Sequence, residues 1–403
     1  MKSPIRVLYL DNTFTFGGAI ISLGYLVRAL DERFQCVVVS GQPIEYLRRA
    51  FEGQVVYHYI PKLPWIDNRI YRRIAPFPLF KLKAFARLLT VLRSLFWICY
   101  VYLPEAIRYY NIGRRHKIDL VHLNNILGSQ LPGIMAAKLL GVPCVAHLRD
   151  FEEVSFATRL YARWIDHHIA ISGAIADNLR DLGVPEEKIT LVHDALDLEN
   201  FATADACDHL YAELNVPRES RRYGLFGRII QWKGVREFIL ASQQVARQVP
   251  GAIGFIVGGA SDGDESYEVE MKKLVADLGL TGKVVFLGYR DQVPPLMNFM
   301  DVVVHASTRA EPFGMVVIEG MAMGKPVVAT RGGGPLDIVV DGETGTLVQP
   351  GDPDDLAAAI VRLLQEPGLA REMGGRGLAR VREHFDSRMY ADKMQDVYAK
   401  QMR

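Results

Sequence analysis

The sequence predicts two α/β domains, each a doubly wound parallel sheet with helices on both faces. Short apolar runs alternate with helical stretches along the chain, and this pattern restarts near residue 223 after a stretch of mixed charge. A length of 403 residues also suits two domains of roughly 150 to 200 residues each. We therefore expect an N-terminal domain over residues 1–200, a C-terminal domain over residues 201–386 and a linker near residues 197–220.

The first half contains seven runs with strand character. They are residues 5–10, 36–39, 55–60, 120–122, 143–147, 168–171 and 188–192. Gly17 and Gly18 follow the first run and open a helix that extends to about Leu30. A strand, a glycine turn and a helix are typical of nucleotide-binding halves, although an ordinary tight turn has the same residues.

The second half repeats the alternation. Strands are predicted over residues 223–226, 253–257, 284–287, 302–304 and 327–329. Helices are predicted over residues 315–323, 354–364 and 388–402, and a further helix over residues 172–182 belongs to the first half.

Two cations follow the first strand of the second half, in the segment Gly227-Arg228-Ile229-Ile230-Gln231-Trp232-Lys233-Gly234. Arginine grips phosphate through two parallel hydrogen bonds, and lysine acts as a point charge. Arg228 and Lys233 are therefore candidate ligands of a phosphate group, the alternative being two surface bases.

A loop with Glu311, Phe313 and Gly314 precedes the helix that begins at Met315 and Val316. The start of a helix offers free backbone N–H groups and a partial positive charge, which favour an anion. Glu311 and Glu319 carry carboxylates that could accept hydrogen bonds from sugar hydroxyls. Alternatively, Glu311 compensates the helix dipole and Glu319 is a solvated helix residue, although its neighbours are apolar.

Polar residues also follow strands of the first half. His147, Arg149 and Asp150 come at the end of one predicted strand, and Asn124 and Asn125 end the preceding strand. Since ligands of α/β sheets bind at the carboxyl ends of strands, these side chains are candidates for a second binding surface. A structural histidine and ordinary turn asparagines are the alternatives.

The segment from residue 301 to 348 resembles the donor-sugar motif of the retaining glycosyltransferases of family 4, which have the GT-B fold. The resemblance rests on Glu311 and Glu319 in a Glu-x7-Glu pattern, on GMAMGKPVVAT and on GGGPLDIVVDGETGTLV. It implies two Rossmann-like domains that face a central cleft, and a last helix (387–403) that packs back on the first domain. Asp337 stands where the family usually has Glu, and Asp194-Ala195 where it has Asn-Gly.

The resemblance also implies roles for the candidate residues. His147 would lie near the reacting sugar carbon and be catalytic, together with Arg228, Lys233 and Glu311. Donor contacts would come from Gly17, Gly18, Arg228, Lys233, Glu311, Phe313, Gly314, Met315, Val316 and Glu319. Asn124, Arg149 and Asp150 would contact the acceptor. A nucleotide-diphospho-sugar is the expected donor, with no cofactor and no metal, because fixed cations and the helix start can stabilise the leaving diphosphate.

Residues 69–117 carry eleven basic residues and one acid, Glu105, although the whole chain has a net charge of only +1. Apolar residues recur there at helical spacing, at Phe85, Leu88, Leu89, Leu92, Leu95, Phe96 and Cys99. Such a helix is expected to lie in an anionic membrane surface, and its apolar run is too short to span a bilayer. The alternative is a core helix with a basic solvent face. A membrane location makes a lipid-linked acceptor the expected partner, as in bacterial glycoconjugate or polysaccharide synthesis.

The overall composition narrows the alternatives. A net charge of +1 gives no general nucleic-acid signature. Cys36, Cys99, Cys144 and Cys207 lie far apart without metal-ligand spacing, so we expect buried thiols and a reducing compartment. Together with the membrane segment at residues 69–117, this predicts a peripheral protein on the inner face of the cytoplasmic membrane. A non-catalytic GT-B binding protein and a GT-B nucleotide-sugar epimerase remain alternatives, and the sequence does not predict an oligomeric state.

Overall fold

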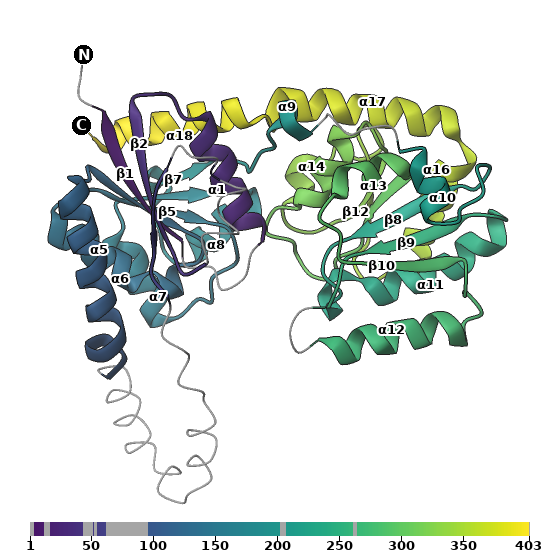
Figure 1. The fold of residues 1–403 in the computed structure, drawn as a ribbon, viewed down its shortest axis with the longest axis horizontal. Helices are drawn as coiled ribbons and strands as arrows, with labels where there is room; N and C mark the ends of the chain where they lie inside the picture. The colour runs from purple at the N-terminus through teal and green to yellow at the C-terminus, as the bar shows by residue number, and fades with distance from the viewer. Residues whose placement is uncertain are drawn as a thin grey trace, which may run out of the picture. The chain divides into compact units, whose positions relative to one another are not determined.

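The computed structural model describes residues 4–11, 17–42, 51, 55–61, 96–201, 207–260 and 264–402. They form two compact units (Figure 1). Unit 1 comprises Met1–Ala170, Ala176–Thr190 and Met394–Arg403, and unit 2 comprises Ile171–Ile175 and Leu191–Lys393. The change of unit near residue 190 lies close to the boundary predicted at residue 200, and the last ten residues return to unit 1.

Unit 1 contains a sheet of seven strands in the order β3-β2-β1-β4-β5-β6-β7, and every pair with a described register is parallel. The strands are β1 (Ile5–Asp11), β2 (Phe34–Ser40), β3 (Val56–Tyr59), β4 (Leu120–Asn124), β5 (Cys144–Leu148), β6 (His167–Ala170) and β7 (Ile189–Leu191). The strand order reverses between β1 and β4, where Asp11 pairs with Asn124. All seven predicted strands are confirmed within a few residues of their predicted ends.

The helices that belong to this half are α1 (Gly18–Ala29), η2 (Ile98–Tyr102), α5 (Leu103–His116), η3 (Leu127–Ser129), α6 (Leu131–Leu140), α7 (Phe156–Trp164), α8 (Gly173–Asp181) and η4 (Glu186–Lys188). Alternate residues of the central strands face different helices, as the pleat requires. A Cβ atom added to Gly133 of α6 would meet the side chains of Leu10 and Leu123, whereas Tyr9 and His122 interact with Tyr398 of α18 (Ser387–Gln401). The last helix therefore closes one face of the unit 1 sheet.

Unit 2 contains a six-stranded parallel sheet in the order β10-β9-β8-β11-β12-β13. The strands are β8 (Arg222–Phe226), β9 (Ile253–Val257), β10 (Val284–Gly288), β11 (Val302–His305), β12 (Val327–Thr330) and β13 (Thr346–Val348). Here the order reverses between β8 and β11. The five predicted strands are confirmed, whereas β13 is an edge strand that the sequence reading did not assign.

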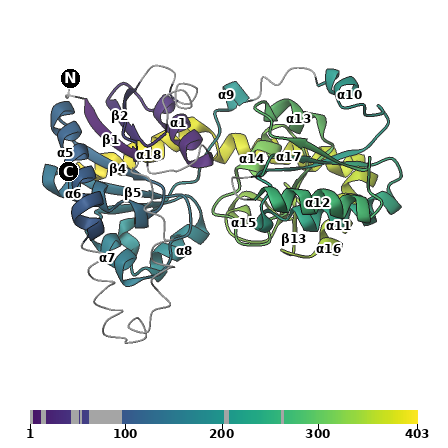
Figure 2. The same cartoon turned by 60° about the horizontal axis from the view of Figure 1, so that its bottom comes forward.

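Helices cover both faces of this sheet (Figure 2). They are α9 (Leu198–Phe201), α10 (His209–Glu213), η5 (Gln231–Lys233), α11 (Val235–Gln248), α12 (Glu265–Asp277), α13 (Val293–Phe299), α14 (Met315–Ala322), α15 (Pro335–Ile338), α16 (Pro353–Gln365) and α17 (Pro367–His384). One buried core joins the sheet to α11 and α16 through Tyr223, Phe238, Val304 and Ile360. The predicted linker is not irregular throughout, because α9 and α10 lie within it.

The four cysteines and the basic segment at 69–117 differ from the other expectations in their outcome. The cysteines were expected to be buried, but Cys99 is exposed and Cys207 is partly exposed, while Cys36 and Cys144 are buried. Of the basic segment at 69–117, residues 69–95 lie outside the described residues, so only η2 and α5 can be examined. Within the described ranges, no helix has both the length and the apolar character needed to cross a bilayer.

Candidate active site

Arg228 lies where two strands of unit 2 end against each other. Gly227 follows β8 with a φ of +141°, and Gly258 follows β9 with a φ of +148°. A Cβ atom on Gly258 would lie 1.8 Å from the Gly227 carbonyl oxygen, so only glycine allows this close approach. The Arg228 side chain that follows is exposed, and its guanidinium has no partner among the described residues. It is therefore available to an anionic ligand.

Lys233 is positioned by the short helix η5. Gly234 has a φ of +73° and lies against the loop that follows β11. A Cβ atom on Gly234 would be 1.8 Å from the Ala306 carbonyl oxygen. The Thr308 N–H donates to the Trp232 carbonyl at 2.8 Å and fixes η5 against the same loop. As a result the Lys233 Nζ lies 2.7 Å from both carboxylate oxygens of Glu311 and 4.2 Å from the centre of the Trp232 ring.

The predicted glycine turn supports the loop that carries Glu311. The Gly334 N–H donates to the Glu311 carbonyl at 2.8 Å, and a Cβ atom on Gly333 would lie 2.0 Å from that oxygen. Burial by itself raises the pKa of the Glu311 carboxyl, but the hydrogen bond to His305 and the charge of Lys233 outweigh it and hold that pKa well below its usual value. Glu311 is therefore ionised at neutral pH.

Three residues that the sequence reading missed complete this cluster. His305, at the end of β11, places its Nε2 3.3 Å from Glu311 Oε2 and 3.1 Å from the Ser307 hydroxyl. The Ser307 hydroxyl donates to the same carboxylate oxygen at 2.9 Å, and the Thr330 hydroxyl at the end of β12 lies 3.3 Å from His305 Nδ1. The sequence pattern that could have indicated these residues is a polar side chain at or just after the end of an apolar strand.

The start of α14 has no side-chain cap. Gly314, at a φ of +109°, precedes the helix. Its first-turn N–H groups, which include those of Met315 and Val316, are thus left for a ligand. Phe313 is buried at 2 % exposure, so only its backbone can serve a ligand there.

Glu319 lies inside α14, as predicted, and is partly buried. Its carboxylate has no hydrogen-bond partner among the described residues. Burial raises the pKa of this carboxyl to about 7. A buried acceptor of this kind needs hydrogen-bond donors, and a ligand with paired hydroxyls would supply them.

The predicted residues of unit 1 form a separate cluster at the carboxyl ends of β1, β4 and β5. Asn124 accepts a hydrogen bond from Arg149 Nε at 2.6 Å and donates to Asp11 at 2.9 Å. The amide therefore links a buried cation to a buried carboxylate. The neighbouring Asn125 has a φ of +98°, which fits the turn that was its alternative role. Gly17 and Gly18 lie at the start of α1, with Gly17 as its N-cap.

His147 belongs to the same cluster and is fully buried. Arg149 Nη2 lies 3.4 Å from its Nδ1, and its ring packs edge-on against His122 at 5.4 Å. Burial lowers the pKa of His147, and the Arg149 charge lowers it further, so its imidazole is neutral. Asp150, in contrast, is exposed and accepts a hydrogen bond from the Phe151 N–H at 2.8 Å.

Asp337, the shorter carboxylate at a family Glu position, has partners of its own. It accepts the Gly173 N–H at 2.6 Å and lies 3.2 Å from His193 Nε2. Burial alone would raise the pKa of Asp337, but the His193 and Gly173 hydrogen bonds lower it overall. His193 immediately precedes the other departure, Asp194, which is buried. One departure, Asp337, is thus a partner in this interaction. The other, Asp194, directly follows the second partner, His193.

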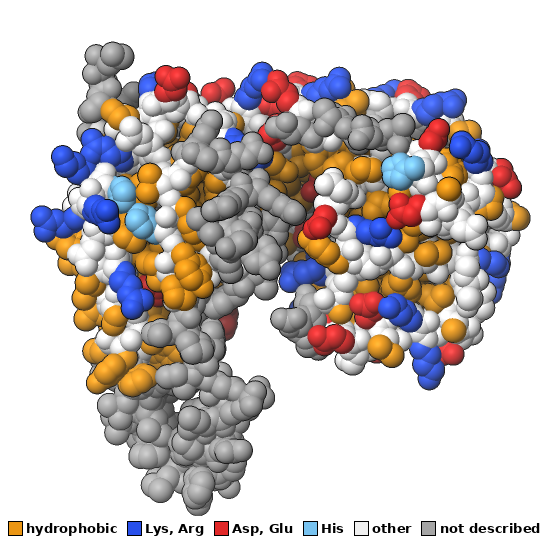
Figure 3. Space-filling model, in the orientation of Figure 1, with side chains coloured by type: hydrophobic (Ala, Val, Ile, Leu, Met, Phe, Trp, Pro, Cys, Tyr) orange, Lys and Arg blue, Asp and Glu red, His pale blue; other side chains and the backbone are white. Residues whose placement is uncertain are grey.

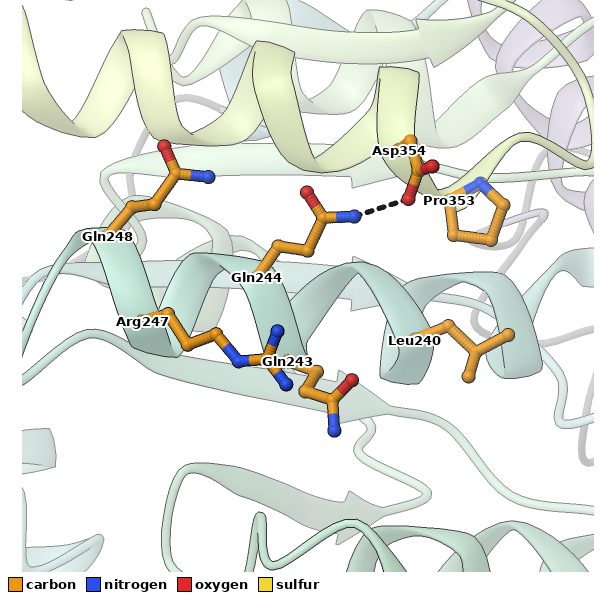
Figure 4. Close-up of a pocket in the computed structure, with 7 residues that line it drawn as sticks. All are labelled: Leu240, Gln243, Gln244, Arg247, Gln248, Pro353 and Asp354. Carbon is orange, nitrogen blue, oxygen red and sulfur yellow. Dashed lines mark hydrogen bonds between the residues drawn. The ribbon is translucent and has the colours of Figure 1, made fainter.

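A pocket of about 410 Å³ lies between α11 and the start of α16 (Figure 4). Its walls are Leu240, Gln243, Gln244, Arg247, Gln248, Pro353 and Asp354, and Gln244 donates to Asp354. None of the predicted site residues lines it. Among the described residues, no group of three or more His, Cys, Asp or Glu side chains could hold a metal ion.

Comparisons with known proteins identify the family of this chain. The profile of the family "Glycosyl transferases group 1" matches residues 211–380, and that of "Glycosyltransferase Family 4" matches residues 75–200. The lipopolysaccharide core biosynthesis glycosyltransferase LpsE of Rhizobium meliloti is 33% identical over 223 residues, which cover 55% of this chain and 61% of LpsE. The 2-deoxystreptamine glucosyltransferase of Streptomyces kanamyceticus is 30% identical over 288 residues, covering 65% of this chain and 73% of the relative.

Solved structures share the fold. HepE of Anabaena in complex with UDP superposes with a TM-score of 0.79 at 24% identity, over 98% of this chain and 100% of HepE. A glycosyltransferase of Rickettsia africae superposes with a TM-score of 0.82 at 18% identity, over 99% of each chain. With both family profiles, close relatives and the two parallel-sheet domains in agreement, this chain belongs to the GT-B glycosyltransferases of family 4.

Proposed function

We propose that this glycosyltransferase moves a sugar, with retention of configuration, from a nucleotide-diphospho-sugar to a lipid-linked acceptor. The observation that carries the proposal is the ion pair of Lys233 and Glu311 in the loop before the uncapped start of α14, with the exposed guanidinium of Arg228 on the adjacent strand end. HepE, a protein of the same fold, has been solved with UDP and with UDP-glucose, which supports a nucleotide-sugar donor.

Each group has a separate task in this proposal. Arg228, Lys233 and the N–H groups at the start of α14 stabilise the diphosphate as it gains charge during bond cleavage. Glu311 holds the hydroxyls of the transferred sugar, and the unpartnered Glu319 accepts the ribose hydroxyls. A phosphate oxygen of the donor receives the acceptor proton on the face where the bond breaks, so the protein supplies no nucleophile.

The test is a screen of nucleotide-sugars based on uridine, guanosine and adenosine, read as release of free nucleoside diphosphate. We expect one base to be strongly preferred and the release to survive excess EDTA, since the two cations and the helix start replace a metal. Loss of release on chelation, restored by Mg²⁺ or Mn²⁺, would remove the metal-free mechanism. Tight nucleotide binding without release would favour a binding protein, and an epimerised nucleotide-sugar would favour an epimerase. The anomer formed on the acceptor, read by NMR, tests retention.

The acceptor side of the proposal rests on an exposed apolar stripe of unit 1. Phe96, in the helical turn before η2, and Tyr100, Leu103 and Ile107, in η2 and α5, are 39–67% exposed. They recur at spacings of three and four, so they share one helical face. The rings of Phe96 and Tyr100 stack at 4.8 Å. Figure 3 shows apolar side chains gathered over the lower part of α5 as drawn in Figure 1. A contiguous apolar face of this kind marks a lipid or protein contact.

The charge of the same segment supports lipid as its partner. Further along α5 the exposed side chains of Arg108, Arg114, Arg115 and Lys117 are basic, and the segment as a whole is strongly cationic. Basic residues beside an interfacial helix are attracted to anionic lipid, with about 1 kcal/mol for each cation near the surface. The inner leaflet of the cytoplasmic membrane carries such lipid, and the similarity to LpsE supports a glycolipid acceptor.

Liposome flotation tests this surface. The protein should float with anionic vesicles, bind neutral vesicles less and be released in part at high salt. Replacing Phe96, Tyr100, Leu103 and Ile107 with serine should abolish flotation and leave the release of nucleoside diphosphate intact. Val269→Ser, at an equally exposed apolar position of unit 2, is the matched control. If the unmodified protein stays at the bottom of the gradient at low salt, the stripe does not bind membranes.

A further inference from the structure

Ser172 lies at the start of α8, in a short part of unit 2, residues 171–175, that is flanked in the sequence by two parts of unit 1. The residue is fully buried, and its hydroxyl both accepts and donates. It accepts the Ile175 N–H at 3.2 Å, as an N-cap serine does, and it donates to the Pro312 carbonyl at 2.6 Å. The cap is a local role, but the second bond reaches 140 positions along the chain, into the loop that carries Glu311.

The neighbouring Gly173 makes another link to the same loop. Its N–H donates to the Asp337 carboxylate at 2.6 Å, and a Cβ atom on Gly173 would lie 3.2 Å from that carboxylate, so a larger residue would crowd it. The Asp337 N–H donates to the Gly334 carbonyl at 2.9 Å, and the Gly334 N–H donates to the Glu311 carbonyl at 2.8 Å. The start of α8 is therefore also joined to the loop through the glycine turn.

These links hold different parts of the loop. The glycine turn holds the backbone of Glu311, whereas Ser172 holds the next residue, Pro312, on the side of α14. Proline has no N–H, so its carbonyl is the only backbone group through which a hydrogen bond can hold this residue. Phe313 is anchored by its buried ring, but Gly314 has a φ of +109° and no side chain, so it does not itself restrain the backbone. The Ser172 hydroxyl therefore helps to set where α14 starts relative to Glu311.

We propose that Ser172 is a positioning residue of the donor site. Its hydroxyl holds the Pro312 carbonyl and thereby keeps the Glu311 carboxylate and the first-turn N–H groups of α14 at a fixed spacing. The inference rests on the proposed function, which assigns the sugar hydroxyls to Glu311 and the diphosphate to those N–H groups. Ser172 is fully buried, so it acts through Pro312 and not on the donor itself. Preorganised groups depend on their spacing, and a displacement of about 1 Å can lower the rate by about 10².

Ser172→Ala removes the hydroxyl and tests this role. The measurement is release of nucleoside diphosphate from UDP-glucose, or from GDP-mannose or ADP-glucose if the screen selects that base, well below the unfolding temperature. We expect kcat to fall by about tenfold, because the glycine turn still limits the displacement of the loop. The donor KM should change by less than about threefold, because the ribose contact proposed for Glu319 is untouched.

Ser242→Ala is the matched control. Ser242 is also fully buried in unit 2, and its hydroxyl donates to the Phe238 carbonyl at 2.7 Å within α11, outside the candidate site. Both variants should unfold at a lower temperature, since each loses a buried hydrogen bond. Only Ser172→Ala should lose kcat and show faster hydrogen exchange from Gly314 to Val317. A merely structural role of Ser172 would lower the unfolding temperature and leave kcat unchanged.

Ser172→Thr keeps the hydroxyl and can still cap α8, so it should restore most of kcat. If Ser172→Ala does not fold, Ser172→Cys, with only a weak S–H donor, takes its place with the same expected direction.

The outcomes separate the two proposals. Unchanged kcat in Ser172→Ala, an equal loss in the Ala and Thr variants, or a loss without faster exchange overturns the role of Ser172 alone. If the unmodified protein releases nucleoside diphosphate from no nucleotide-sugar, the proposed function is overturned, and the role of Ser172 with it.

Discussion

The two sheets place polar clusters at equivalent positions and treat them differently. In each unit the strand order reverses between two central strands, β1 and β4 in unit 1 and β8 and β11 in unit 2, and polar residues follow both pairs. In unit 1, Asp11, Asn124 and Arg149 are at most 6 % exposed and are bonded to one another. In unit 2, Arg228 is exposed, and the Glu319 carboxylate has no partner among the described residues.

The two clusters thus differ in how far their polar groups are satisfied by the protein itself. Buried charges that are joined by hydrogen bonds are costly to separate. They contribute little to the binding of a ligand that cannot reach them. Unsatisfied groups at a strand end, in contrast, carry a cost in the free protein that a ligand can remove. We therefore expect substitutions in unit 1 to act mainly on stability, and those in unit 2 mainly on activity.

The largest effect is expected for Asn124→Leu. The change removes the amide that links Arg149 to Asp11, and two hydrogen bonds to charged groups together are worth about 3 kcal/mol or more. Thermal unfolding should begin at a clearly lower temperature, and hydrogen exchange should accelerate in β1, β4 and β5 but not in unit 2. Asp150→Asn, at an exposed position on the same edge, should change stability by less than about 0.5 kcal/mol. A stable Asn124→Leu protein with lost activity would place this cluster in the catalytic machinery instead.

The next largest effect is expected for Lys233→Ala. Removal of one preorganised charge at a developing negative charge typically lowers kcat by about 10² or more. Because Glu311 loses its counter-ion in this variant, the unfolding temperature should also fall, so kcat is compared well below it. Lys272→Ala, which breaks an exposed ion pair with Glu268 on α12, is the control and should retain full activity. An active Lys233→Ala enzyme would contradict the phosphate assignment.

A smaller effect concerns Glu319 and pH. Its pKa of about 7 means that the carboxyl is protonated below pH 7 in the free protein and cannot accept both ribose hydroxyls. The donor KM should therefore rise by about tenfold for each pH unit below 7 and stay constant above it, since one pH unit corresponds to a tenfold change. Steady-state kinetics from pH 5.5 to 8.5 test this, and a flat KM profile would contradict the ribose role.

The same carboxyl should lower stability. Its folded-state pKa lies above the ordinary carboxyl value, so the native state binds more protons than the unfolded state between these two values. Stability from this group is present at low pH and is lost as pH rises toward 7. Glu319→Gln should therefore raise the unfolding temperature at pH 8 while it raises KM, which is the combination expected of a ligand-binding residue.

The sequence predicted the fold well because local patterns determine it. Apolar strands such as Val302–Val304 and the glycines at turns depend on short-range sterics and burial, which one sequence displays directly. Arg228, Lys233, Glu311 and Glu319 were predicted as site residues for a similar reason, since their spacing reports the loop and helix that hold them.

The rest depended on contacts between distant parts of the chain. His305 gains its role from Glu311 and from Thr330 on the next strand, and neither its spacing nor its neighbours in sequence indicate this. The pairing of Asp337 with His193, 144 positions away, was equally hidden. His147 was predicted as catalytic from the resemblance. The sequence does not show that His147 is completely buried beside Arg149, because this follows from the folded sheet.

The smallest expected effect concerns the ring that holds Lys233. In unit 1 the buried Arg149 is bonded to an amide, whereas in unit 2 the Lys233 ammonium lies 4.2 Å from the centre of the Trp232 ring. A cation over a partly exposed ring is stabilised by about 0.5–1 kcal/mol, so Trp232→Leu should lower kcat/KM about two- to fivefold.

Trp232→Phe keeps an aromatic face and should restore most of this loss, which a purely steric role for the indole would not allow. The contact between the ring and the Lys233 ammonium is electrostatic, so kcat/KM of the Leu and Phe variants is measured at the same salt concentration. The difference between the two variants should persist under this condition. Both variants should unfold at nearly the same temperature as the unmodified protein, because Trp232 is only partly buried. Equal activity of the Leu and Phe variants would show that the ring does not orient Lys233, and that Glu311 alone positions the cation before the donor arrives.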